Sequence, residues 1–87
     1  MKLMIIIVRN EDDEAVIREL VQKDFRVTRM ASTGGFLRRG NSTLLVGVED
    51  DQVDPVTAIL RRTCCSPEEG QHRATVFVVN MREYIKV

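Results

Sequence analysis

The apolar run Leu3–Val8 is the feature that most restricts how this chain can fold. Six consecutive apolar residues are few for a helix, and three adjacent isoleucines favour an extended strand over a helical turn. Because polar residues do not alternate with apolar ones, the run predicts a buried strand. Leu44–Val46 and Val76–Val79 have the same character, so we expect a sheet that is apolar on both faces.

Residues 10–24 predict the first helix, of about three turns. Acidic side chains crowd its first turn, where they favour the positive end of the helix dipole, and Asn10 or Asp12 is expected to cap it. We expect the acidic run at residues 11–14 to be a solvated helix start. The apolar stripe consists of two i,i+4 pairs, Val16 with Leu20 and Ile17 with Val21.

Residues 51–63 predict a second helix, with Asp51 or Asp54 as its cap. Residues 25–32, a segment beginning at Ser42, and residues 74–81 predict the remaining strands. The resulting order is βαββαβ, which indicates an α+β, ferredoxin-like fold: a four-stranded antiparallel sheet with two helices on one face. The open face would be a large apolar patch, and a second copy of the same chain is its simplest cover.

The composition is typical of a globular chain with one domain, residues 1–87. Thirteen basic and thirteen acidic residues give a net charge of zero, which counts against general DNA or RNA binding. We find no membrane span and no secretory signal, so we expect a cytoplasmic location. Cys64, Cys65 and the single histidine, His72, lack metal-ligand spacing, so no metal or cofactor is expected. Because no nucleophile stands beside a base, we do not expect an enzyme.

The segment from Met30 to Asn41, MASTGGFLRRGN, is longer and more apolar than a connection between two strands requires. Gly34 and Gly35 can adopt positive φ angles and present backbone N–H groups as a nest for an anion. Hydroxyl and arginine side chains flank this Gly-Gly pair. On these residues alone, the segment could be an ordinary surface loop or an anion-binding cradle.

The stretch FRVTRMASTGGFLRRGNSTLLVGVEDDQVD, together with the later ATVFVV, resembles the cyclic di-AMP receptor family of PII-like signal-transduction proteins. The likeness covers Met1 to about Cys64 and Arg73 to Val79. It implies the ferredoxin-like fold and a homotrimer that covers the open sheet face. It further implies that cyclic di-AMP binds in clefts between subunits, and that the protein signals to an unknown downstream partner without catalysis.

The resemblance also implies a set of ligand-binding residues. Arg26 and Thr28 would reach a phosphate or ribose, and backbone N–H groups after the Gly-Gly pair would bond phosphate or adenine. Asn41 would bond an adenine edge, two phenylalanine rings would offer apolar surface to the bases, and Gly47 would leave room for the ligand. The matching residues are Arg26, Thr28, Thr33, Gly35, Phe36, Leu37, Asn41, Gly47 and Phe77.

The chain departs from the family pattern in two places. Eight residues separate Cys65 from Ala74, where family members carry a long loop, and Lys86 stands where a glutamine packs on adenine. The ligand could therefore be cyclic di-AMP or a related adenine nucleotide. Alternatively, the protein is a PII-like structural or interaction module that binds no nucleotide.

Overall fold

Strand β1 (Lys2–Arg9) is an inner strand of the sheet. In the computed structural model, which describes residues 1–30, 40–64, 74–83, 85 and 87, it pairs antiparallel with β3 (Asn41–Val48) on one side. On its other side it pairs antiparallel with β4 (Ala74–Asn80). The short strand β2 (Val27–Met30) extends the sheet beyond β3, so the strand order is β2-β3-β1-β4. The predicted four-stranded antiparallel sheet is confirmed.

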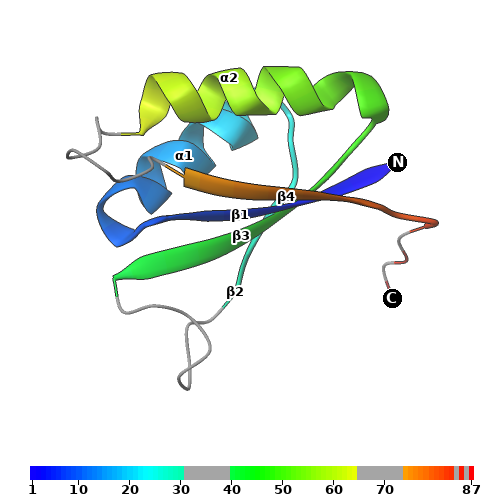
Figure 1. Ribbon diagram of the computed structural model, residues 1–87, viewed down its shortest axis with the longest axis horizontal. Helices are drawn as coiled ribbons and strands as arrows, with labels where there is room; N and C mark the ends of the chain where they lie inside the picture. Colours follow the sequence, from blue (N-terminus) through cyan, green and yellow to red (C-terminus); the bar gives the residue numbers. More distant parts are fainter. Residues whose placement is uncertain (31–39, 65–73, 84, 86) are drawn as a thin grey trace.

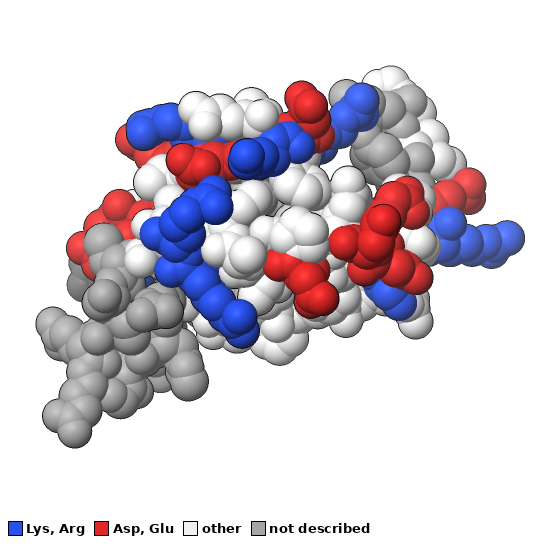
Figure 2. Space-filling model, turned by 90° about the horizontal axis from the view of Figure 1, so that it is seen from above, with Lys and Arg blue, Asp and Glu red and all other residues white. Residues whose placement is uncertain are grey.

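Both helices lie on the same side of this sheet (Figure 1). Helix α1 (Asn10–Gln22) joins β1 to β2. The 3-10 turn η1 (Asp50–Gln52) leads directly into α2 (Val53–Thr63), which follows β3. The order βαββαβ and this layering confirm the α+β, ferredoxin-like fold. The helix-bearing side carries charged side chains of both signs, as expected for a solvated surface (Figure 2).

The core lies between the sheet and the helices. Strand alternation places Met4, Ile6 and Val8 on this side, and all three are fully buried or nearly so. They pack against buried apolar residues of α1, β3 and α2 and against the residue that follows α2; these residues are Val16, Leu20, Leu44, Val46, Val48, Val56, Ile59, Leu60 and Cys64. The core therefore accounts for every second apolar residue of β1, namely those that face the helices.

The opposite face of the sheet carries no helix (Figure 1). The strand register aligns its side chains in rows, one of which runs from Thr28 through Leu45 and Ile5 to Phe77. Phe77 is 52% exposed, and Val79, in the next row, is also exposed. The expected apolar open face is present, and nothing in the described part of a single chain covers these two residues.

Helix α1 ends earlier than predicted, and strand β2 begins later. The N–H of Asp24 bonds to the carbonyl of Val21, and the N–H of Phe25 bonds to that of Leu20. These two bonds form a Schellman ending, in which Asp24 takes the left-handed position with φ 66°. Because the Phe25 N–H is used by the helix, the strand starts at Val27, two residues after the predicted start.

The predicted helix caps were wrong. Arg9 occupies the N-cap position of α1 without a side-chain cap, and the N–H of Asn10 is satisfied by the Gly40 carbonyl at 2.8 Å. Ahead of α2, Glu49 and Gln52 form a capping box around η1. A backbone carbonyl and a glutamate thus take the places that were assigned to Asn10 or Asp12 and to Asp51 or Asp54.

Two further expectations about α1 were wrong. The run at residues 11–14 is not uniformly solvated, because Asp12 and Asp13 are buried. In the apolar stripe, Val16 and Leu20 are fully buried, but Val21 is 55% exposed. Val21 lies on the side of the helix that turns toward the free edge of β2 and lines a pocket there.

Candidate functional site

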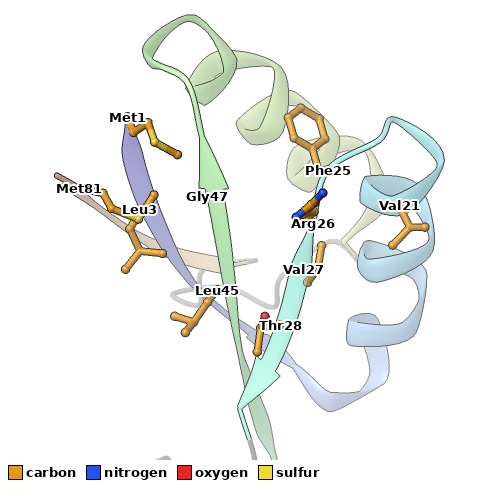
Figure 3. Close-up of a pocket in the computed structure, with 10 residues that line it drawn as sticks. All are labelled: Met1, Leu3, Val21, Phe25, Arg26, Val27, Thr28, Leu45, Gly47 and Met81. Atoms are coloured by element: carbon orange, nitrogen blue, oxygen red, sulfur yellow. The ribbon is translucent and has the colours of Figure 1, made fainter. Parts of the chain in front are cut away.

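A pocket of about 570 Å³ opens at the end of the sheet where β1 begins (Figure 3). It runs beside the edge strand β2 and across β3 toward the residue that follows β4. Most of the described residues that line it are apolar, and they come from five separate parts of the chain. They are Met1, Leu3, Val21, Phe25, Arg26, Val27, Thr28, Leu45, Gly47 and Met81.

Gly47 leaves the pocket open at its floor. It lies opposite Leu3 in the sheet register and faces the side that carries no helix. A Cβ atom at this position would lie 3.4 Å from Met81 Cε, which is ordinary contact with the end of a flexible side chain. A larger side chain would have to extend into the space between the flanking strands. The predicted role of Gly47, a position kept free of side-chain atoms, fits this geometry.

The polar wall of the pocket comes from β2 and the residue before it. Arg26 contributes the one charged side chain among the described lining residues, and Thr28 contributes a hydroxyl from the position opposite Leu45. Both residues are exposed. The Schellman ending of α1 determines where this segment starts, since it turns the chain at Asp24 and directs the next residues along the sheet edge. The pocket therefore combines a cation and a hydroxyl with an apolar floor.

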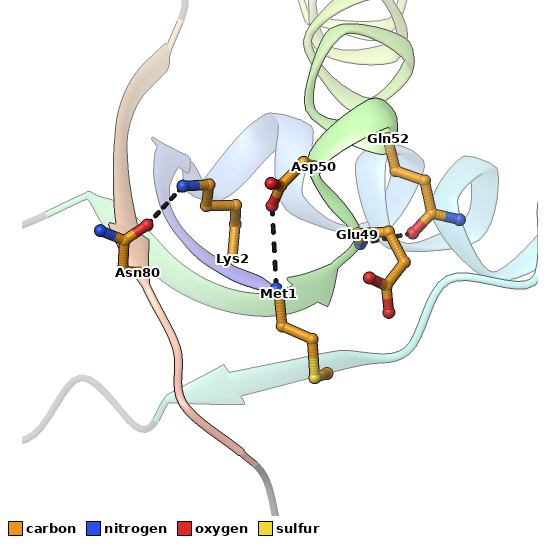
Figure 4. A network of polar contacts seen from close by, with 6 residues as sticks. All are labelled: Met1, Lys2, Glu49, Asp50, Gln52 and Asn80. Atoms are coloured by element: carbon orange, nitrogen blue, oxygen red, sulfur yellow. Dashed lines mark hydrogen bonds and ion pairs between the residues drawn. The ribbon is translucent and has the colours of Figure 1, made fainter.

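Polar contacts beside the pocket tie the start of β1 to η1 and to the end of β4 (Figure 4). The N–H of Met81 bonds to the Met1 carbonyl at 3.1 Å, and Lys2 Nζ donates a hydrogen bond to Asn80 Oδ1. The amino group of Met1 lies 3.7 Å from the carboxylate of Asp50 in η1. Exposed ion pairs of this kind contribute little stability. The hydrogen bonds and the ion pair matter here for geometry, because together they hold Met1 and Met81 beside Gly47.

Comparisons with known proteins agree with this arrangement. A family model described as cyclic-di-AMP receptor matches residues 1–87, the whole chain. The chain belongs to the cyclic-di-AMP receptor family. This membership supports a nucleotide-binding role in signalling.

Among solved structures, this member of the cyclic-di-AMP receptor family is similar to a functionally unknown protein from Pediococcus pentosaceus. The two chains are 28% identical and superpose with a TM-score of 0.78. The match covers 99% of this chain and 96% of the other.

The predicted ligand-binding residues fall into three groups. Arg26, Thr28 and Gly47 line the pocket together. Asn41 lies six residues before Gly47 on β3, about 20 Å away at 3.3 Å per residue, and Phe77 lies three strand spacings, about 14 Å, from Thr28. The structure therefore does not bring these two into the pocket of the same chain. The remaining predicted residues, Thr33, Gly35, Phe36 and Leu37, lie outside the described residues.

Sequence reasoning missed the apolar part of the pocket. Met1 precedes β1 and Met81 follows β4. They reach the same place, far apart in sequence as they are, because β1 and β4 are antiparallel neighbours. The strand order could have indicated this meeting point, but the residue types could not. Leu3 and Leu45 were predicted as members of an apolar sheet face and not as pocket residues.

Two kinds of feature are absent from the part of the chain that the structure describes: a cluster of metal-ligating side chains and a helix that could cross a membrane. Within it, no three histidine, cysteine or acidic side chains gather in a way that could hold a metal ion. His72 and Cys65 lie outside that part. The described helices are all too short or too polar to cross a bilayer.

Proposed function

We propose that this member of the family binds cyclic di-AMP, or a closely related adenine nucleotide, in clefts between the subunits of a homotrimer. Binding would change the surface that the trimer presents to a downstream protein, without catalysis. The observation that carries the proposal is the pocket in which Arg26, Thr28 and Gly47 meet. Three residues chosen from a ligand-binding motif share one concave site of about 570 Å³, a volume within the usual range for small-molecule pockets.

The chemistry of the pocket suits a nucleotide. A guanidinium can hold a phosphate through two parallel hydrogen bonds, and a neighbouring hydroxyl can complete the contact with phosphate or ribose. The floor at Leu3, Leu45 and Gly47 is apolar and has no side chain at Gly47, which leaves room for a purine ring. Phosphate and base would thus be held on two different sides of the same pocket.

A site between subunits accounts for the predicted residues outside the pocket. Asn41 and Phe77 face the same open side of the sheet as Gly47, but they are too distant to touch a ligand that fills the pocket of their own chain. A second copy packed on the open face could bring its own Asn41 or Phe77 to the pocket rim. The same packing would cover Phe77 and Val79, the exposed apolar residues that β4 contributes to the open face.

Calorimetric titration of the purified protein with cyclic di-AMP, ATP and cyclic di-GMP tests the proposal. We expect cyclic di-AMP or ATP to bind, and cyclic di-GMP to bind more weakly. Replacing Arg26 with Gln should weaken binding roughly 10- to 150-fold, because a hydrogen bond to a charged group contributes about 1.5–3 kcal/mol. Arg18, an exposed arginine on α1 that does not line this pocket, provides the matched control as Arg18→Gln.

Sedimentation analysis of the same samples tests the assembly. A trimeric mass with no binding of any of the three nucleotides at high micromolar concentration would contradict the receptor proposal and favour an interaction module. A monomeric mass with nucleotide bound would contradict the interface site while leaving nucleotide binding intact. Equal losses of affinity in Arg26→Gln and Arg18→Gln would exclude a specific role for the pocket arginine.

A further inference from the structure

A buried carboxylate joins α1 to two strands of the sheet. Asp13 lies in the first turn of α1, and its side chain is 11% exposed. Its Oδ2 atom accepts a hydrogen bond from Ser42 Oγ at 2.7 Å and lies 3.1 Å from Arg29 Nη2. Ser42 belongs to β3 and Arg29 to β2, so one carboxylate is bonded to both strands where they approach the start of the helix.

The same end of α1 makes two further contacts with β3. Ser42 Oγ also lies 2.7 Å from Asn10 Oδ1, and the N–H of Asn10 bonds to the Gly40 carbonyl at 2.8 Å. A hydroxyl has one proton, and the charged carboxylate of Asp13 is the stronger acceptor for it. A half-turn of the Asn10 amide would let its NH₂ group donate to Ser42 in return. The beginning of β3 is therefore fixed to the helix by side-chain and backbone bonds together.

Strand β2 is held mainly by its backbone pairing with β3 and has little apolar packing of its own. It is four residues long and lies at the sheet edge, and Val27 is its one half-buried residue. Arg29 is 46% exposed, yet its guanidinium reaches back over the helix side to the buried carboxylate. The Asp13–Arg29 pair adds to this backbone pairing a side-chain attachment between β2 and α1.

Strand alternation connects this cluster to the opposite face. Arg29 and Ser42 face the helices, so their chain neighbours Thr28 and Asn41 face the open side. We propose that Asp13 is a positioning residue, which fixes Thr28 and Asn41 for ligand binding by holding Arg29 and Ser42 on the other side of the sheet. The role in binding rests on the proposed function, whereas the coupling across the sheet does not.

Electrostatics and positioning predict opposite effects of neutralising Asp13. A cyclic dinucleotide is an anion, so removing a nearby negative charge would strengthen its binding if charge alone mattered. If Asp13 acts by positioning, the Asn variant has a smaller fraction of molecules with Thr28 and Asn41 in place, and the apparent affinity falls by that fraction. We expect Asp13→Asn to bind cyclic di-AMP about tenfold more weakly than the wild type.

Glu14 provides the matched control. It is the next residue of α1, it is exposed, and Glu14→Gln makes the same change in charge without removing a hydrogen bond or ion pair to either strand. We expect Glu14→Gln to bind cyclic di-AMP within twofold of the wild type. Ser42→Ala provides a milder second variant, because it removes one hydrogen bond and keeps the ion pair. It should weaken binding about threefold and lose most of that effect in the Asp13→Asn background.

Nuclear magnetic resonance of the ligand-free protein separates positioning from general loss of stability. In Asp13→Asn we expect the backbone amide of Thr28 and the side-chain NH₂ of Asn41 to shift or broaden, while core amides such as that of Ile6 keep their wild-type positions. Glu14→Gln should leave all three signals unchanged. A merely destabilised protein would instead show the same folded spectrum with a lower melting temperature.

The two proposals can fail separately. If the wild type binds no nucleotide, the proposed function fails, and the ligand-free spectra alone decide whether Asp13 orders the two open-face residues. If the wild type binds cyclic di-AMP and Asp13→Asn binds it equally well or more tightly, the positioning role is refuted and the function stands. Unchanged Thr28 and Asn41 signals in Asp13→Asn would refute it in either case.

Discussion

Substituting Gly47 separates the shape of the pocket from the stability of the fold. Gly47 lies inside β3 and its backbone φ is not positive, since Gly40 is the glycine with positive φ in the described part of the chain. A glycine inside a strand costs about 0.5–1 kcal/mol relative to alanine. The nearest atom to an added Cβ, Met81 Cε at 3.4 Å, can move aside. Gly47→Ala and Gly47→Val should therefore be as stable as the wild type or up to about 1 kcal/mol more stable.

Ligand affinity should change in the opposite direction. The branched side chain of valine would occupy the floor of the pocket between Leu3 and Leu45. Forcing a ligand against extra methyl groups costs typically 1–3 kcal/mol, so we expect Gly47→Val to bind cyclic di-AMP roughly 5- to 150-fold more weakly. Gly47→Ala should lie between valine and the wild type.

Thermal unfolding and calorimetry of the three proteins provide the measurement. One kcal/mol corresponds to about 4–8 °C in the melting temperature of a domain of 60–100 residues, so both variants should melt at or above the wild-type temperature. Wild-type affinity in Gly47→Val would refute the placement of the ligand over β3. A melting temperature lowered by more than about 5 °C would refute the argument that the fold tolerates a side chain here.

Three other substitutions test single features of the structure. Gly40→Ala should cost about 1–2 kcal/mol in chemical denaturation, because φ at this residue is 91° and no neighbouring atom would clash with the added methyl group; an unchanged midpoint would contradict this reading of the backbone. Asp24→Gly should stabilise the protein by about 0.5–1 kcal/mol by relieving the left-handed residue of the Schellman ending, measured by the same denaturation. Val79→Asp should dissociate the proposed trimer in sedimentation experiments, since it puts a charge on the open sheet face; a trimer that persists would move the interface elsewhere.

The sheet and its layering were predictable because hydrophobic periodicity encodes them directly. The length and isoleucine content of the β1 run favour a strand, the spacing of Val16 and Leu20 favours a helix, and the βαββαβ order leaves few ways to combine them. Local ends were less predictable. The end of α1 depends on two backbone bonds around Asp24, and its start depends on the Gly40 carbonyl, which is thirty residues away in sequence. No side-chain pattern near either end encodes these partners.

The candidate site was predictable in part, for a related reason. Arg26, Thr28 and Gly47 could be chosen from the family motif, and strand pairing then brings them together. Asn41 and Phe77 came from the same motif, but the motif does not state which residues share a pocket in one chain. The role of Arg29 was hidden as well: in the sequence it breaks the alternation of its strand, and in the structure it is the partner of a buried carboxylate.

The two faces of the sheet thus carry different sets of contacts. On the helix side, Asp13, Arg29 and Ser42 attach the weakly packed edge of the sheet to α1. On the open side, the neighbouring positions of the same strands carry the candidate ligand contacts. Because adjacent residues of a strand point to opposite faces, the two sets cannot move independently. If a ligand binds as proposed and orders Thr28, it would also order the neighbouring Arg29; ligand binding and the placement of β2 would then be thermodynamically linked, and each would strengthen the other by the same free energy.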